Sequence, residues 1–159
     1  AEGEDMAEGT AAPSPAGETD ALDEALAAEH AAVWGYGVVG AALAAERRRS
    51  AAAAENAHRD ARDGLVALLA ERDAEPGGPE GAYELPFPVL SEADAVALAI
   101  ILEDGVAAAW VRVLAAAVDP ATRQLAVDAL GATEVRAVGW RARAGSTPVT
   151  SPFPGLPEG

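Results

Sequence analysis

The sequence predicts an all-α four-helix bundle, built from two antiparallel hairpins that a long crossover loop joins. Three observations support this fold class. Half of the 159 residues are hydrophobic but only 4% are aromatic, since alanine, the strongest helix former, dominates the apolar fraction. Apolar residues recur at alternating steps of three and four, as in helices packed in a bundle. Pro and Gly interrupt this pattern between the second and third helical stretches.

The first hairpin is predicted from Asp20 onward. The inward face of its first helix carries Leu22, Leu26, Glu29, Val33, Tyr36, Gly40 and Leu43. A turn is expected between Gly40 and Ala45, because glycine can end a helix in the left-handed conformation. The second helix fades near Pro76, and one face of it carries Glu55, His58, Arg62, Leu65 and Leu69.

The second hairpin follows a crossover loop at about residues 76–90. Ser91 with Asp94 resembles a capping box and predicts a helix start. The seam of this third helix carries Val96, Ile100, Glu103, Ala107, Trp110 and Leu114. Asp119 before Pro120 predicts the start of the fourth helix, which Gly145 and Pro148 close. Its inward face is predicted to carry Val127, Leu130, Glu134 and Ala137.

Composition and charge divide the chain and restrict its partners. Residues 1–19 are predicted to be a disordered acidic tail, residues 20–145 the bundle, and residues 146–159 a Pro-rich tail. A net charge of -15 disfavours nucleic acid and anionic membranes as partners. No secretory signal and no apolar membrane span is recognisable, so a cytoplasmic location is expected, although a signal-stripped mature chain would look the same. We also expect a homodimer, because a small bundle with Trp residues often buries apolar area by association.

Inward glutamates are the candidate functional residues. Carboxylates and imidazole are ligands that iron and manganese accept, and bundles hold such ions on facing helices. The predicted metal ligands are Glu29, Glu55, His58, Glu103 and Glu134. The midpoint of Glu103 and Glu134 falls at the Asp-Pro break, which places the two residues at one level of a hairpin. Ala137 stands where a second histidine would complete the cage, so one ion is expected more than two.

The same glutamates allow a metal-free alternative. Four buried carboxylates require a metal, a proton or an arginine, because an unpaired buried charge costs several kcal/mol. Arg62 and Arg141 each lie one helical turn beyond a candidate position and could supply the positive charge. In that case the bundle would act as an interaction or small-ligand-binding module. Phosphate-binding loops and serine-triad motifs are absent from the sequence.

Four segments resemble a known group of proteins. They are Ala28-Glu29-His30 leading to Tyr36, Glu55-Asn56-Ala57-His58, Leu102 to Val106 running to Trp110, and Glu134 in the last helix. They are similar to the ferritin-like superfamily and, more narrowly, to an actinobacterial ferritin-like domain of unknown function, DUF4439. The closing segment from Pro148 to Pro157 is similar as well.

The resemblance implies roles for the candidate ligands. Relatives with complete motifs bind two iron or manganese ions and perform oxidase, peroxidase or storage chemistry. It would make Glu29 and Glu103 terminal ligands, Glu55 and Glu134 bridging ligands, and His58 the nitrogen ligand of the first metal. Ala137 departs from the motif at the second metal.

Overall fold

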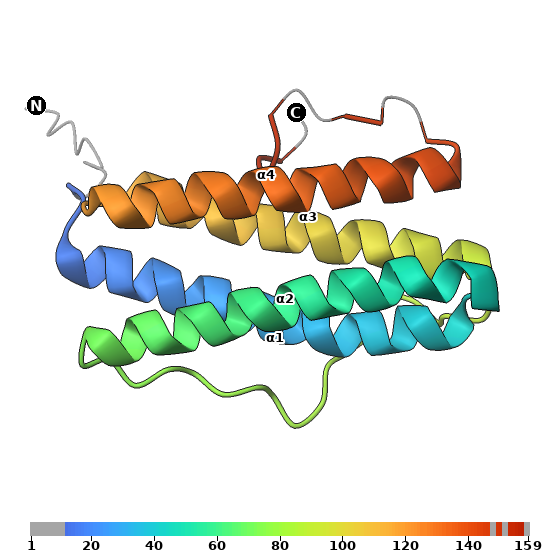
Figure 1. The fold of residues 1–159 in the computed structure, drawn as a ribbon, viewed down its shortest axis with the longest axis horizontal. Coiled ribbons are helices and arrows are strands. Elements are labelled where there is room, and N and C mark those ends of the chain that lie inside the picture. The colour runs from blue at the N-terminus through green and yellow to red at the C-terminus, as the bar shows by residue number, and fades with distance from the viewer. Residues whose placement is uncertain (1–11, 147–148, 151–152, 158–159) are drawn as a thin grey trace, which may run out of the picture.

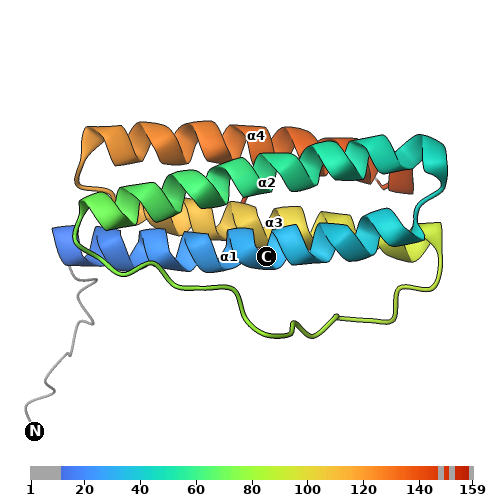
Figure 2. The same ribbon diagram turned by 60° about the horizontal axis from the view of Figure 1, so that its bottom comes forward.

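The computed structural model describes residues 12–146, 149–150 and 153–157. Four helices make up the fold: α1 (Pro15–Ala42), α2 (Ala45–Glu71), α3 (Glu92–Ala116) and α4 (Pro120–Ala144). Figure 1 shows that α1 and α2 form one antiparallel hairpin and that α3 and α4 form the other. The loop 72–91 runs back along the bundle and joins them (Figure 2). The predicted all-α four-helix bundle with a crossover is confirmed.

Short polar motifs fix the helix ends. The Ser91 hydroxyl accepts a hydrogen bond from the amide of Asp94, 3.1 Å away, and α3 begins directly after it. Asp119 caps α4 in the same way, with Pro120 in the first helical position. Gly145 ends α4 with φ at 69°, a conformation that side chains with a Cβ rarely adopt. These boundaries were all predicted from the sequence.

The N-terminal boundary differs from the prediction. Helix α1 begins at Pro15, five residues before the predicted start at Asp20, because the Ser14 hydroxyl caps it and proline suits a first helical turn. Glu18 is completely buried, so residues 15–19 belong to the folded domain. Residues 1–11 of the predicted acidic tail lie outside the described residues.

Packing is uneven around the bundle. Helix α1 packs against α2 and α3, and α3 packs against α4. One apolar cluster lies toward the start of α1 and includes Leu22, Leu26, Leu65, Leu69 and Trp110. The other lies toward the α1–α2 turn and includes Tyr36, Val39, Leu43, Leu98 and Trp140. The buried polar residues His58 and Glu103 fall between the two clusters along α2 and α3, and Glu29 lies within the first cluster along α1.

The predicted inward faces of α2 and α4 are correct in part. His58, Leu65 and Leu69 of α2 and Ala137 of α4 are buried as predicted. Ala54 is 3% exposed and points inward in α2, whereas its neighbour Glu55 is partly exposed. In α4, Ala126 and Thr133 are buried in place of their neighbours Val127 and Glu134, and Val127 is 47% exposed. Because alanine occurs on every face of these helices, apolar periodicity alone did not fix these positions.

The segment after α4 returns to the bundle. A Cβ added to Gly155 would lie 2.7 Å from the carbonyl oxygen of Ala107, so this residue packs directly against the backbone of α3. None of the described helices is long and apolar enough to cross a membrane.

Candidate functional site

A network of buried charged side chains lies at the middle of the bundle. The His58 ring is fully buried between two carboxylates from other helices. Its Nδ1 lies 2.6 Å from Oε2 of Glu29, and its Nε2 lies 3.0 Å from Oε1 of Glu103. Arg136 of α4 donates from Nε to both oxygens of Glu103, at 3.1 and 3.2 Å. Each of the four helices therefore contributes one charged group, and we call these four residues the central network.

Aromatic donors complete the hydrogen bonds of the central network. The indole of Trp110 donates to Oε1 of Glu29 at 2.9 Å, and the hydroxyl of Tyr36 donates to Oε1 of Glu103 at 2.5 Å. Trp140 donates in turn to the Tyr36 hydroxyl at 2.8 Å. In the described part of the chain, no buried side-chain nitrogen or oxygen lacks a hydrogen-bond partner. The network is therefore satisfied by protein groups alone.

The network shifts the protonation of two of its members. Burial alone would lower the pKa of His58, but the hydrogen bonds and charges of Glu103 and Glu29 outweigh burial and raise the pKa to about 9. Burial, followed by the negative charge of Glu103, raises the pKa of Tyr36 far above its ordinary value. Below pH 9, an imidazolium and a guanidinium thus face two carboxylates, and the charges balance.

The structure brings together three of the five predicted metal ligands, namely Glu29, His58 and Glu103. Glu55 instead pairs with Arg59 one turn along α2, at 2.6 Å, and its side chain is 24% exposed. In the described residues, no group of three or more His, Asp or Glu side chains is arranged to hold a metal ion. Metal binding therefore remains a prediction.

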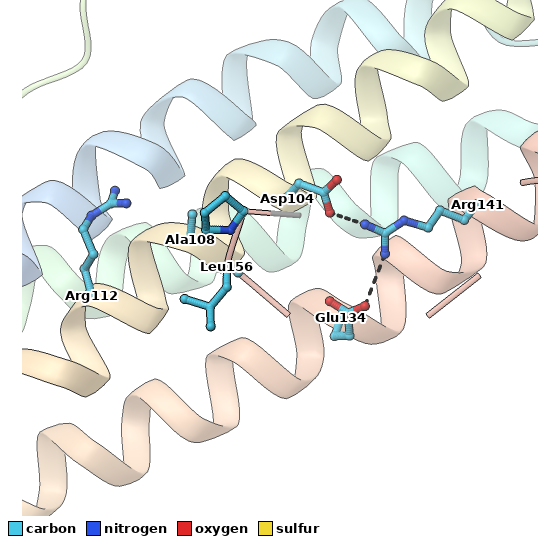
Figure 3. Close-up of a pocket in the computed structure, with 8 residues that line it drawn as sticks. Asp104, Ala108, Arg112, Glu134, Arg141 and Leu156 are labelled. Atoms are coloured by element: carbon cyan, nitrogen blue, oxygen red, sulfur yellow. Dashed lines mark hydrogen bonds and ion pairs between the residues drawn. The ribbon is translucent and has the colours of Figure 1, made fainter. Parts of the chain in front are cut away.

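Glu134, the fifth predicted ligand, lies in a surface hollow between α3 and α4. Arg141 bridges it to Asp104, with distances of 3.2 Å to Glu134 and 2.5 Å to Asp104 (Figure 3). The hollow is also lined by Leu156, from the segment that follows α4. In the metal-free alternative Arg141 was considered as a partner for the glutamates inside the bundle; it pairs with Glu134, but in this hollow. Arg62, the other arginine considered, pairs with Asp63 at 2.9 Å.

Arg136 is the member of the central network that sequence reasoning missed. Hairpin spacing does not identify it, because equal distance from the α3–α4 turn pairs Glu103 with Thr133, and Arg136 lies almost one helical turn farther along α4. In the first hairpin, His58 lies as far after the Leu43–Ala44 turn as Glu29 lies before it. The rule that equal distance from a turn gives equal height in a hairpin therefore selects His58 over Glu55, but it gives no signal for Arg136, whose long side chain reaches Glu103.

A second buried carboxylate, Glu18, lies at the end of the bundle where α1 begins. It accepts hydrogen bonds from the amides of Val118 and Asp119 and from the Thr122 hydroxyl. Nη1 of Arg72 approaches it to 2.5 Å. Burial alone would raise the pKa of Glu18, but the hydrogen bonds from Asp119, Thr122, Val118 and Arg72 lower it to about 2. Glu18 thus ties α1 to the end of α2 and to the α3–α4 turn.

Comparison with known proteins agrees with this class of fold, a four-helix bundle with one long crossover. The family model described as "Domain of unknown function (DUF4439)" matches residues 21–158. The chain therefore belongs to this family. It is similar to a solved structure described as a conserved hypothetical protein, rv2844, from Mycobacterium tuberculosis, with 34% sequence identity and a TM-score of 0.80. That match covers 82% of this chain and 98% of the other. A search of curated proteins gives no significant match.

Proposed function

We propose that this protein is a metal-free ferritin-like bundle that acts as a small-ligand-binding module. The observation that carries the proposal is the position of His58, whose two ring nitrogens both face carboxylate oxygens, at 2.6 and 3.0 Å. A neutral imidazole has one N–H and can serve only one such acceptor as a donor. Two carboxylate partners therefore favour the protonated ring, which has no lone pair for a metal.

The donor set does not fit a pair of metal ions. A two-metal cage needs carboxylates that can bridge the ions, whereas Glu55 and Glu134 are held by Arg59 and Arg141. The guanidinium of Arg136 adds a positive charge beside Glu103, where a cation would otherwise lie. A proton and an arginine thus supply the charge balance that the metals supply in ferritin-like proteins with complete motifs. Membership of the ferritin-like superfamily is supported by the order of the hairpins and the crossover.

Metal content of the purified protein tests the proposal directly. The chain is expressed in medium supplemented with iron and, separately, with manganese, and bound metal is measured by mass spectrometry. We expect well below 0.1 ion per chain, and a melting temperature that added ferrous ion does not change. One tightly bound ion per chain would overturn the metal-free proposal.

A single-metal site is the second candidate function. The convergence of Glu29, His58 and Glu103 from three helices favours it, because a metal ion could replace the proton on His58 and displace the guanidinium of Arg136 from Glu103. Ala137 is 1% exposed, and Ala137→His tests this candidate. A metal site would gain iron or manganese from the new imidazole. A metal-free core would gain none and would lose roughly 1 to 3 kcal/mol of stability by overpacking.

Association of two copies also remains a prediction. The outer face of α4 offers exposed apolar side chains, with Val135 73% exposed and Val127 47% exposed. Light scattering over a range of concentrations tests it, and a monomer throughout would rule out the homodimer.

A further inference from the structure

A groove lies between α2 and α4, on the side of the bundle where two helices do not pack directly. These helices face each other across a hollow of about 340 Å³, whereas α1–α2, α1–α3 and α3–α4 pack directly. The side chains that line the hollow are small along α2: Ser50, Ala53, Ala54 and Ala57. On α4, a Cβ added to Gly139 would meet no atom within 4 Å. Small side chains thus keep the groove open and give it an apolar floor.

Arg143 gives the groove a positive charge within an acidic protein. It lines the groove together with Arg136, and the lining in the described chain includes no carboxylate. Arg143 forms no ion pair with any described residue; its Nη2 donates to the Ser50 hydroxyl at 2.7 Å, and its guanidinium lies 4.6 Å from the Trp140 ring centroid. The charge of Arg136 is balanced by Glu103, so the unpaired charge of Arg143 is what favours an anion here, in a chain whose net charge of -15 repels anions elsewhere.

Both guanidinium groups keep donors for a ligand. Arg136 uses Nε for Glu103 and Nη2 for Thr133, which leaves Nη1 without a partner among the described residues. Arg143 uses only Nη2, which donates to the Ser50 hydroxyl, so its Nε and Nη1 also have no partner among the described residues. Contacts with Ser50 and Trp140 hold Arg143 in place before any ligand arrives, which reduces the entropy cost of binding.

We propose that this groove binds a small organic anion, whose carboxylate or phosphate is held between Arg136 and Arg143 and whose apolar part lies on the alanine floor beside Trp140. Guanidinium groups bind both kinds of anion through paired N–H donors. The volume lies at the lower end of ordinary small-molecule sites, so the ligand is compact. This inference rests on the proposed ligand-binding function and names its site and ligand class.

The same groove reaches the central network. Arg136 donates to Glu103, and Trp140 donates to the Tyr36 hydroxyl that also bonds Glu103. An anion bound to the guanidinium of Arg136 competes with Glu103 for the positive charge of that arginine. Binding in the groove is therefore expected to alter the hydrogen bonds of the network, which gives a spectroscopic signal away from the ligand.

Nuclear magnetic resonance with three probes tests the inference on the full chain. Benzoate and phenyl phosphate supply the two anionic groups on one apolar body, and neutral benzamide is the control probe. We expect saturable shifts of the Trp140 indole N–H and the Arg143 Nε–H, with Kd below about 1 mM for at least one anion and no saturation with benzamide. Whichever anion binds more tightly identifies the preferred head group.

Matched variants locate the binding site. Arg143→Gln is expected to weaken binding of the preferred anion at least tenfold. Arg59→Gln removes the same charge from an arginine outside the groove and is expected to leave the affinity within twofold. Equal weakening in both variants, or no saturable binding of either anion, would overturn the inference. Metal measured in the same samples tests the metal-free proposal separately, because a metal-loaded protein and an empty groove are different outcomes.

Discussion

The two buried carboxylate sites of this bundle are stabilised in different ways. At the end of the bundle, Glu18 is surrounded by donors that carry a proton at any ordinary pH: two backbone amides, a hydroxyl and Arg72. At the middle, Glu29 and Glu103 share His58, whose positive charge depends on a titratable proton. The first site is therefore a fixed structural link, and the second depends on pH.

The difference follows from where each site lies along the helices. Backbone N–H groups are free where the chain leaves one helix and has not yet entered the next, and the α3–α4 turn offers those of Val118 and Asp119 to Glu18. In mid-helix every backbone N–H is already bonded within the helix, so a buried carboxylate must find side-chain donors. Glu29 and Glu103 accordingly rely on His58, Trp110, Tyr36 and Arg136.

The largest effect is expected for His58→Leu. This change leaves Glu29 without its cation and Glu103 with only Arg136, inside a region where the side chains of both glutamates are at most 2% exposed. Removing one partner of a buried ion pair costs about 3–5 kcal/mol. The measurement is the free energy of unfolding in urea at pH 7. His30→Leu is the control, because His30 bonds only the Gly77 carbonyl at the surface, and it is expected to cost less than about 1 kcal/mol. A cost below about 1 kcal/mol for His58→Leu would contradict the ion-pair description.

How much the sequence predicted depends on the element. Helix ends were predicted at Ser91, Asp119 and Gly145, because caps are local chemistry. The inward faces of α2 and α4 were predicted only in part, because alanines on every face leave the edge of the apolar stripe undefined. His58, Leu65, Leu69 and Ala137 are buried as predicted, but Glu55 and Glu134 were placed in the core instead of their neighbours Ala54 and Thr133.

Arg136 and Glu18 were missed for different reasons. An arginine is ordinarily a surface residue, and Arg136 lies farther from the α3–α4 turn than Glu103 does, so neither residue type nor hairpin spacing indicates the pair. Glu18 lies in a stretch that its composition predicts to be a disordered acidic tail, and its partners Arg72 and Thr122 are far away in the sequence. Long-range partners of this kind are settled by tertiary structure and not by local pattern.

The next effect concerns the fixed link at the end of the bundle. Glu18→Gln replaces one carboxylate oxygen with an N–H₂ group, which would face either the amides of Val118 and Asp119 at Oε2 or the donors of Thr122 and Arg72 at Oε1. Loss of a buried charged acceptor is expected to cost about 1–3 kcal/mol in the free energy of unfolding. Glu24→Gln is the matched control, because Glu24 pairs with Arg112 at the surface, where a salt bridge contributes at most about 1 kcal/mol. If both variants lose the same stability, Glu18 is not the link described here.

The two sites are expected to respond to pH with opposite signs. The pKa of Glu18 is lowered from 4.5 to about 2 by folding, so its contribution is present above 4.5 and is lost as pH falls toward 2. The pKa of His58 is raised from 6.5 to about 9, so its contribution is present below 6.5 and is lost as pH rises through 9. For each group, the free energy of unfolding can fall by at most about 1.4 kcal/mol per pH unit.

Unfolding curves of three proteins over the pH range separate these contributions. Relative to the unmodified chain, Glu18→Gln should reduce the pH dependence of the free energy of unfolding only at acid pH. His58→Leu should reduce it only at alkaline pH. If His58→Leu leaves the alkaline side unchanged, the shared proton is not the source of the stability there.

The smallest effect is expected for Glu55→Gln, and this variant tests whether Glu55 acts together with His58. Glu55 pairs with Arg59 on the same helix at 2.6 Å, where the Arg59 side chain is 51% exposed. Exposed pairs of this spacing contribute about 0.3–0.5 kcal/mol, because water and salt screen them. We therefore expect a change of at most about 0.5 kcal/mol in the free energy of unfolding, and no change in metal content. If Glu55 were instead a metal ligand beside His58, the substitution would lower metal content and, in metal-loaded protein, the melting temperature. A loss of that kind would make Glu55 a metal ligand together with His58, and the middle of the bundle would then depend on a metal ion and not on the proton of His58.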